Sequence, residues 1–179
     1  MSCGVEIKMK NYKYFENVEK NAYFTDVCCQ FCGRDSYCLE GVFFEREDIS
    51  SVCLECFDKR MVSVDVPDYI KTRVKSCSNQ KITDLQYTPP VPWIQNNDWP
   101  VCCDDFMVYI GEWQQTDFDN YSENKPNNGI EVLKLLLAPE IAQQVENYEN
   151  LWQELGCEAV AFAFRCSCCG KTTVICQEY

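Results

Sequence analysis

The sequence predicts a small, globular α+β protein in which zinc-ribbon-like β hairpins combine with several short helices. Three observations support this class. The chain has 15 cysteines in 179 residues, it carries two Cys-x-x-Cys-Gly turns that each end in a basic residue, and its apolar segments are short. Apolar residues make up 46% of the chain and aromatic residues 13%, which is enough for a modest packed core. We therefore expect a compact fold that is stabilised by zinc sites.

The cysteine content also bears on the cellular compartment. An odd number of cysteines cannot all pair within one chain, and the first residues lack the apolar stretch of a secretory signal. No apolar run approaches the roughly 18–20 residues that cross a membrane. We expect a cytoplasmic protein with reduced thiols, where Cys-x-x-Cys pairs bind metal or do redox work.

Charge and the absence of histidine exclude several functions. Without histidine, Ser-His and Cys-His catalytic dyads cannot form, and the commonest ligand of catalytic zinc is missing. The formal net charge of −12 disfavours binding to nucleic-acid phosphates. A basic protein partner is favoured, because an acidic surface attracts one over a distance. The alternative is that the charge serves solubility alone.

The first candidate metal site has the pattern C-x2-C-x20-C-x2-C. Its ligands are Cys29, Cys32, Cys53 and Cys56. Two residues between thiols allow one tight turn to present both sulfurs to a metal ion, at ~2.3 Å from each. Gly33 follows the second sulfur, where such a turn requires a positive φ. We predict a structural four-thiolate zinc site here, with a redox pair or buried thiols as alternatives.

The segment between these pairs predicts two short strands around Glu40 and Gly41, followed by a polar loop. This arrangement is typical of a zinc ribbon. Cys28 and Cys38 lie near the site but off its pattern, and we interpret both as buried small apolar residues.

A second candidate site contains Cys166 and Cys169. Residues 157–165 alternate as a strand does and 172–177 form another strand, so the cysteines lie at the tip of a β hairpin. Two further ligands are needed, and the adjacent Cys102 and Cys103 are the best remote candidates. Cys168 is expected to point away from the metal. Zinc at the first site and a second zinc at this one are therefore the expected cofactors.

Cys157 and Cys176, on the flanking strands, are alternative ligands for the second site. A site closed by four thiolates offers no open position for water, so it holds structure rather than hydrolysing a substrate.

The rest of the first half predicts an arm and linking segments. Residues 1–27 contain scattered aromatic residues and are expected to pack onto the body. A short helix opens at Pro67. Residues 76–84 look like a polar link. Residues 85–100 hold four of the seven prolines, so they form neither a regular helix nor a central strand.

The second half predicts mostly helices. We expect a helix from Asp104 to about Gly111 and an acidic loop over 114–128. We also expect a helix over 130–137, with a strand as the alternative because this segment begins with β-branched residues. Another helix begins at Pro139 and ends at Gly156. Its apolar face consists of Ile141, Val145, Tyr148, Trp152 and Leu155.

These elements divide the chain into three parts of one integrated domain. Residues 1–113 hold the arm, the zinc ribbon and the proline-rich segment. Residues 114–128 are the acidic loop. Residues 129–179 hold the helical segment and the C-terminal zinc-knuckle hairpin.

The order and spacing of the motifs resemble the CbrC family, an uncharacterised family named after a bacterial gene associated with colicin tolerance. The matching segments are YKYFEN, CQFCGR, LEGVFF, VCLECF, TPPVPWIQ, WPVCCDDFMVYIG and FAFRCSCCGK, which together cover roughly residues 12–176. The resemblance implies paired cysteine motifs at 29, 32, 53 and 56 and a third pair at 166 and 169. It implies no established enzymatic activity, and the colicin association implies protection against a toxin.

Two departures from the family pattern are informative. Relatives tend to have His-Cys where this chain has Cys102-Cys103, and a cysteine in place of a histidine keeps a zinc ligand. Relatives also tend to have His-Pro where this chain has Phe15-Glu16, which puts in doubt any role that the family gives that histidine.

Three functions compete. The first is a non-enzymatic interaction protein, such as an immunity protein that neutralises a basic, nuclease-type bacterial toxin by direct binding. Its candidate contacts are acidic residues interleaved with aromatic ones, unless they simply form a solvated loop. They are Asp104, Asp105, Glu112, Trp113, Asp117, Phe118, Asp119 and Tyr121.

The second function is a zinc-thiolate redox sensor or chaperone. It would use the spare thiols Cys28, Cys38, Cys77 and Cys168. The third is an enzyme that uses carboxylates for acid–base chemistry, but the sequence contains no recognisable nucleophile–base pair or open metal site. We favour the first function.

Overall fold

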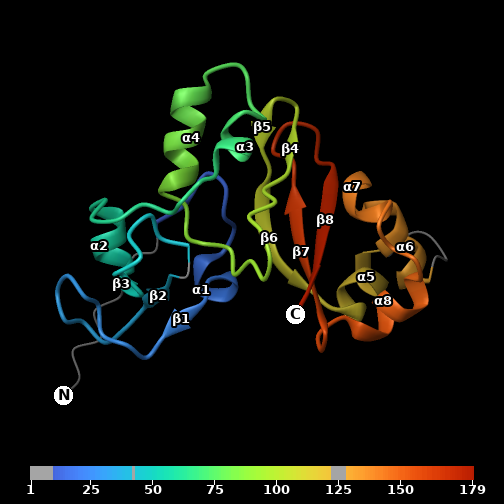
Figure 1. The fold of residues 1–179 in the computed structure, drawn as a ribbon, viewed down its shortest axis with the longest axis horizontal. Helices are drawn as coiled ribbons and strands as arrows, with labels where there is room; N and C mark the ends of the chain where they lie inside the picture. Colours follow the sequence, from blue (N-terminus) through green and yellow to red (C-terminus); the bar gives the residue numbers. More distant parts are fainter. Residues whose placement is uncertain (1–9, 42, 122–127) are drawn as a thin grey trace.

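The computed structural model describes residues 10–41, 43–121 and 128–179, and within them the chain forms a mixed α+β fold. Three small antiparallel sheets have the orders β1-β2-β3, β4-β5 and β6-β7-β8. An N-terminal unit lies on one side of the central sheet, and a group of helices lies on the other (Figure 1). The predicted fold class is confirmed.

The N-terminal unit is built from very short elements. They are α1 (Val18–Asn21), β1 (Phe24–Thr25), β2 (Cys38–Glu40), β3 (Ser51–Cys53) and α2 (Leu54–Asp58). Strand β2 pairs with both neighbours, and its Leu39 faces Val52 in β3, with both side chains fully buried. Strands of two or three residues bury little apolar area, so this unit depends on other interactions for its stability.

The hairpin predicted around Gly41 is wrong in its second strand. The partner of β2 is β3, ten residues further on, and Phe44 instead forms an isolated bridge with Val64. The ring of Phe44 packs so closely over Gly41 that a Cβ there would lie 1.9 Å from it. This packing turns the chain away from a tight hairpin; residue 42 itself lies outside the described residues.

The arm packs onto the body, as predicted for the part of it that the structure describes. Tyr14 and Phe15 are 1% and 3% exposed. The Tyr109 N–H donates to the Tyr14 carbonyl at 2.9 Å, and the Glu16 N–H donates to the Tyr109 carbonyl at 2.9 Å. These bonds align the arm with the outer edge of the central sheet.

The middle of the chain forms α3 (Asp68–Lys71), α4 (Ser78–Gln86), β4 (Val101–Cys102) and β5 (Asp105–Phe106). The helix predicted to open at Pro67 is confirmed, although it makes only one turn. The polar link predicted over 76–84 is wrong, because most of it belongs to α4. Leu85, which is 2% exposed, anchors this otherwise polar helix in the main core.

The helix predicted from Asp104 to Gly111 is also wrong. Cys103 and Asp104 have φ values of 53° and 56°, which a right-handed helix excludes. The Asp104 carboxylate accepts hydrogen bonds from the backbone N–H groups of Lys75 and Ser76, at 2.7 and 2.9 Å. This anchor favours a tight β4–β5 turn, and the chain continues as a strand.

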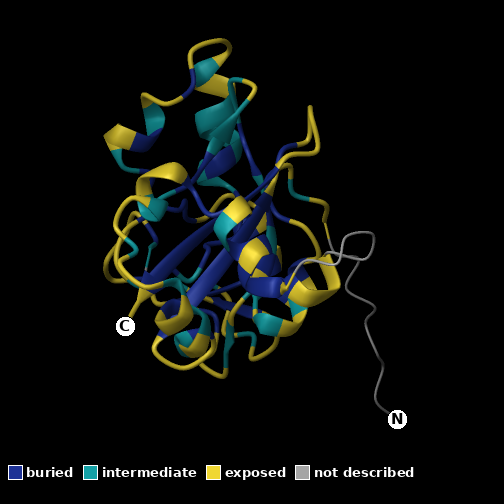
Figure 2. Cartoon of the chain, turned by 90° about the vertical axis from the view of Figure 1, so that its right-hand side faces the viewer, coloured by how far each residue is buried: buried dark blue, intermediate teal, exposed yellow. Residues whose placement is uncertain are grey.

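The central sheet contains β6 (Val108–Trp113), β7 (Ala159–Arg165) and β8 (Thr172–Glu178). Alternation along β7 sends Val160, Phe162 and Phe164 to the main core and the intervening alanines to a second core. The two cores cover both faces of the sheet, and its strands are among the most deeply buried parts of the molecule (Figure 2). The predicted C-terminal hairpin is confirmed.

The proline-rich segment covers the aromatic face of this sheet. The rings of Trp93 and Trp99 lie 5.8 and 5.5 Å from the ring of Phe164, and both tryptophans are buried. Irregular backbone that carries large rings therefore completes the main core, in keeping with the prediction of neither helix nor central strand.

The other face is covered by α5 (Gln115–Tyr121), α6 (Gly129–Leu136), α7 (Pro139–Ala142) and α8 (Tyr148–Glu154). Alanines on this face of β7 leave room for the helices. The predicted helix over 130–137 is confirmed as α6. Among the residues that the structure describes, no helix has the length and apolar character needed to cross a membrane.

Two predictions for this layer need correction. The acidic loop over 114–128 contains α5, while its residues 122–127 lie outside the described residues. Burial of Phe118 at 0% exposure stabilises that helix. The long helix from Pro139 is two short ones, because the Asn147 side chain accepts from Glu149 and Asn150 N–H groups and starts α8 afresh. Gly156, with φ +86°, follows α8 as predicted.

Candidate metal centres

The first cysteine pair lies in a tight turn. The Cys29 N–H donates to the Arg34 carbonyl at 2.7 Å, and the Gly33 N–H donates to the Cys29 carbonyl at 2.8 Å. Gly33 has the predicted positive φ, +72°. The turn brings Cys29 and Cys32 to one side, as a metal knuckle requires.

The second pair lies where a strand becomes a helix. Cys53 ends β3 and serves as the N-cap of α2, and Cys56 lies in the first turn of that helix. The sulfurs of Cys32 and Cys53 are 3.6 Å apart, and all four sulfurs lie within 4.8 Å of one another. We call Cys29, Cys32, Cys53 and Cys56 the N-terminal tetrad; all but Cys32 are buried.

The C-terminal hairpin repeats the same turn. The Cys166 N–H donates to the Lys171 carbonyl at 2.8 Å, and the Gly170 N–H donates to the Cys166 carbonyl at 3.0 Å. Gly170 has φ +74°. Cysteine, glycine and basic residue thus have equivalent roles in both knuckles, and the similarity seen in the sequence reflects one local structure used twice.

The β4–β5 turn completes the second site. The Cys102 sulfur lies 3.5 Å from that of Cys169 and 3.8 Å from that of Cys103. With Cys166 these cysteines form a group whose sulfurs all lie within 4.8 Å, which we call the C-terminal tetrad. Here only Cys166 is buried, while Cys103 and Cys169 are exposed.

The structure separates the first-choice ligands from the alternatives. Cys157 is exposed and Cys176 is buried in the second core, and neither belongs to the tetrad. Cys168 also lies outside it, as expected. Near the N-terminal tetrad, Cys38 is fully buried as predicted, but Cys28 is exposed, so its interpretation as a buried apolar residue is wrong.

Both tetrads fit a tetrahedral metal ion. A metal–sulfur distance of ~2.3 Å places sulfurs about 3.8 Å apart along the edges of a tetrahedron. The shortest separations, 3.5 to 3.8 Å, agree with that edge. They are too long for disulfides, which require ~2.05 Å. Each tetrad could therefore hold one metal ion with four cysteine ligands.

Comparison with known proteins places the chain in a family. The sequence model of the uncharacterised protein family UPF0167 matches residues 9–177. The chain belongs to this family. No curated protein and no solved structure matches the chain.

Each tetrad of this UPF0167 protein contains one thiol that ionises easily. Burial opposes ionisation of Cys29, but hydrogen bonds from the backbone of Cys53, Phe31 and Cys32 outweigh it and lower the pKa of the thiol to about 6. A hydrogen bond from the Lys171 backbone, aided by the neighbouring thiols, lowers the pKa of Cys169 to about 7.

Other thiols of the two tetrads have raised pKa values. Burial and the neighbouring thiols raise the pKa of Cys56, and the neighbouring thiols, Cys169 foremost, raise the pKa of Cys103. A divalent cation would remove this conflict, because its charge favours deprotonation of all four ligands.

Charged side chains surround the N-terminal tetrad of the UPF0167 protein. Arg34, at the end of the first knuckle, contacts the Glu55 carboxylate at 2.5 Å, and Lys59 contacts the same carboxylate at 2.7 Å. Glu55 lies between Cys53 and Cys56 in the chain, so the ion pair joins the two halves of the tetrad. The sequence alone did not indicate Glu55 as the partner of Arg34.

The predicted partner-binding acids mostly serve the fold. Asp105 accepts a hydrogen bond from the Tyr14 hydroxyl at 2.6 Å, and Glu112 accepts one from the Tyr23 hydroxyl at 2.9 Å. Asp104 anchors the β4–β5 turn. Asp117 and Asp119 accept hydrogen bonds from backbone N–H groups, at 2.8 and 3.0 Å.

The predicted aromatic contacts form a packed group. The ring of Trp113 lies 5.3 Å from that of Phe118 and 5.3 Å from that of Tyr121. Phe118 is fully buried and cannot contact a partner, which corrects that prediction, whereas Tyr121 is 48% exposed. These residues build the junction between β6 and α5, and the solvated-loop alternative is wrong for those within α5.

Proposed function

We propose that this protein is a non-enzymatic zinc protein that acts by binding another protein. The observation that carries this proposal is the pair of four-cysteine tetrads, each of which uses all its ligands to join separate segments of the chain. A metal closed in by four thiolates has no position for water or substrate, which favours a structural role. The absence of histidine supports the same interpretation.

The donor set favours zinc among the metals. Tetrahedral sites of four sulfurs hold zinc or iron, and hard cations such as magnesium or calcium require oxygen ligands. The N-terminal tetrad would hold zinc through Cys29, Cys32, Cys53 and Cys56, and the C-terminal tetrad through Cys102, Cys103, Cys166 and Cys169. In both tetrads, the charge of the bound ion would keep the four thiols deprotonated. The ion would offer no open coordination position for a reaction.

Metal content tests this proposal. We expect elemental analysis of the purified chain to give about two zinc ions per chain, because each tetrad completes one four-thiolate site. A Cys102→Ser/Cys103→Ser variant should retain about one, and the control Cys168→Ser should retain two. Iron in place of zinc, or less than one zinc per chain, would contradict the proposal.

We infer further that the partner is basic and that the protein acts in the cytoplasm as an immunity protein against a nuclease-type toxin. The net charge of −12 supports a basic partner, and occupied tetrads would make the protein more acidic still. The resemblance to the CbrC family, named for colicin tolerance, supports protection against a toxin. A reducing cytoplasm would preserve free thiols at both tetrads.

Capture experiments at graded ionic strength test the partner. We expect the immobilised protein to retain a basic nuclease toxin domain at low salt and to lose it as salt screens the charges. An acidic domain of similar size serves as the control. Failure to retain any basic toxin domain encoded beside this gene, even at low salt, would reject the immunity role.

A second candidate function, a redox sensor, is favoured by one observation. Cys103 and Cys169 of the C-terminal tetrad are exposed, and exposed Cys168 precedes Cys169 in the chain, whereas the N-terminal tetrad exposes only Cys32. Hydrogen peroxide could accept two electrons from two of these thiolates. One S–S bond would form, the peroxide would leave as two waters after taking up two protons, and the metal would be released.

Peroxide titration with a zinc-reporting dye separates this function from a purely structural one. If the C-terminal tetrad is a sensor, mild oxidant should release about one zinc per chain, with the new disulfide mapped to residues 102, 103, 166 or 169. The Cys102→Ser/Cys103→Ser variant should release none at that dose. Retention of both ions in the wild type would reject the sensor.

A further inference from the structure

A pocket of about 490 Å³ lies between the α7–α8 connection, α8, the end of β8 and Gln95, and none of its lining residues belongs to either tetrad. Its apolar wall includes Ile141, Val145 and Leu151. This volume falls within the range of pockets that bind ligands, about 300–1,000 Å³. The helices that line it lie on the side of the central sheet away from the N-terminal unit (Figure 1).

The charged residues that line the pocket are all acidic. Its lining includes the carboxylates of Glu146, Glu154 and Glu178 and no lysine or arginine. The segments that build it, 85–100, 135–164 and 172–179, contain no basic residue at all. None of these glutamates forms an ion pair with any residue that the structure describes.

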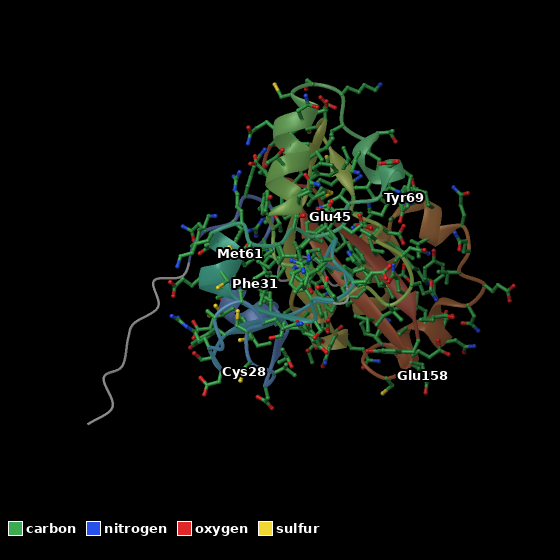
Figure 3. All side chains as sticks on the ribbon, turned by 60° about the vertical axis from the view of Figure 1, so that its left-hand side comes forward. Cys28, Phe31, Glu45, Met61, Tyr69 and Glu158 are labelled. Carbon is green, nitrogen blue, oxygen red and sulfur yellow. The ribbon has the colours of Figure 1, made fainter. Side chains whose placement is uncertain are left out.

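The acidic surface continues beyond the pocket. Glu158 is exposed at the start of β7, next to the C-terminal end of β8, where its carbonyl accepts the Tyr179 N–H at 3.0 Å. In Figure 3 it lies well apart from Cys28 and Phe31, which mark the N-terminal metal unit. A partner at this surface would therefore leave the N-terminal tetrad uncovered.

A neutral, unpartnered thiol also lines the pocket. Cys176 is 8% exposed, and no hydrogen bond joins its sulfur to any part of the chain that the structure describes. Burial raises the pKa of this thiol to about 12, so it adds no negative charge to the apolar wall. Such a surface suits the methylene groups of a long cationic side chain.

The wall behind Cys176 is fixed in place. The Gln177 side chain accepts the N–H groups of Ile94 and Gln95 at 2.9 and 3.1 Å and donates to the Asn96 carbonyl at 2.7 Å. Gln177 is 3% exposed. These bonds tie β8 to the proline-rich segment, so a ligand need not order this wall of the pocket.

We propose that this pocket receives an arginine or lysine side chain from a basic protein partner. The inference rests on the proposed function, to which it adds a docking surface. The aliphatic part of the side chain would lie against Ile141, Val145 and Leu151, and its charged end would reach the glutamates. An anion would be repelled, and a wholly apolar ligand would leave the carboxylates desolvated without a partner.

A matched pair of peptides tests the charge requirement. The zinc-loaded chain is titrated with acetyl-Gly-Arg-Gly-amide and with the same peptide carrying citrulline, which is uncharged but nearly identical in shape. We expect the arginine peptide to shift the amide resonances of residues 141–154 and 176–178, and the citrulline peptide to leave them unchanged. Equal binding of both peptides, or shifts confined to other regions, would overturn the proposal.

Matched variants test the site itself. Glu154→Gln/Glu178→Gln should weaken binding of the arginine peptide roughly fivefold, as expected for the loss of two partly exposed charge pairs. Glu19→Gln/Glu47→Gln removes the same charge from the surface elsewhere and should leave the affinity unchanged. Equal weakening by both double variants would show only a general charge effect and would overturn the site.

A small-molecule arm tests the choice of occupant. Agmatine carries the same guanidinium and aliphatic stem without a peptide backbone. Binding of agmatine more than tenfold tighter than that of the peptide would assign the pocket to a free organic cation and overturn a protein partner there. Comparable or weaker binding supports the proposal.

The outcome for the pocket is separable from that for the proposed function. Zinc content and the dispersion of the amide spectrum are measured on the same samples, so a loss of metal or fold is recognised directly. If a captured toxin domain binds the wild type and Glu154→Gln/Glu178→Gln equally, the pocket is rejected while the immunity role stands.

Discussion

Replacing Cys56 with serine is expected to unfold the N-terminal unit and reduce the zinc content by about one ion per chain. Cys56 is 7% exposed and lies in the first turn of α2, which has only five residues. A helix of that length is not stable alone, and the strands beside it have two or three residues. The metal would therefore supply most of the free energy that orders this region.

The magnitudes explain why one ligand matters so much. Structural zinc binds small cysteine sites with about 10–16 kcal/mol, while a whole domain is stable by about 5–15 kcal/mol. Loss of one ligand also leaves three thiols crowded in a largely buried site. Amide spectra should lose the dispersed signals of residues 24–58, and the signals of β7 and β8 should persist.

Cys28→Ser is the matched control, because Cys28 adjoins Cys29 of the same tetrad but is exposed and lies outside that tetrad. It should keep two zinc ions and a native spectrum. A Cys56→Ser protein with a native amide spectrum in the N-terminal unit would show that packing alone holds this unit together.

Local chemistry explains which parts of the metal sites were predictable. The tetrad of Cys29, Cys32, Cys53 and Cys56 follows from spacing, because the knuckle is a turn of six residues that its own hydrogen bonds close. The C-terminal knuckle follows in the same way. Its completion by Cys102 and Cys103 involves contacts between distant segments, and the sequence left it as one of several choices.

The errors have a common physical origin in tertiary contacts. The segment 104–111 begins with two aspartates, which suit the first turn of a helix, but the anchor between Asp104 and the backbone of Lys75 and Ser76 selects a turn. The segment 114–128 is acidic enough to predict a loop, but burial of Phe118 selects a helix. Composition and periodicity describe a segment alone, whereas these outcomes depend on what packs against it.

The same limit applies to the candidate partner surface. Acids interleaved with aromatics at 104–121 look like a contact surface, yet Asp105 and Glu112 accept hydrogen bonds from tyrosines of the N-terminal arm and Phe118 is buried. The pocket between α7, α8 and β8 escaped the sequence analysis because three distant segments build it. Their shared lack of basic residues was visible in the sequence, but their proximity was not.

Replacing Phe164 with alanine is expected to lower the free energy of unfolding by about 3–5 kcal/mol, the usual cost of removing a buried phenylalanine ring. Phe164 is fully buried in β7. Its ring lies 5.8 Å from that of Trp93, 5.5 Å from that of Trp99 and 5.4 Å from that of Tyr109. Denaturant unfolding monitored by tryptophan fluorescence would measure the change.

The position of Phe164 explains why the effect should extend beyond one contact. Its ring fills the space between the central sheet and the irregular proline-rich segment. That segment is not hydrogen-bonded to the sheet as a strand, so side-chain contacts have to hold it in place. Tyr179→Ala is the control, since it removes an aromatic ring that is 74% exposed and should change the stability by less than about 1 kcal/mol. If Phe164→Ala were as mild, the proline-rich segment would be held chiefly by the hydrogen bonds of Gln177 and not by the stacked rings.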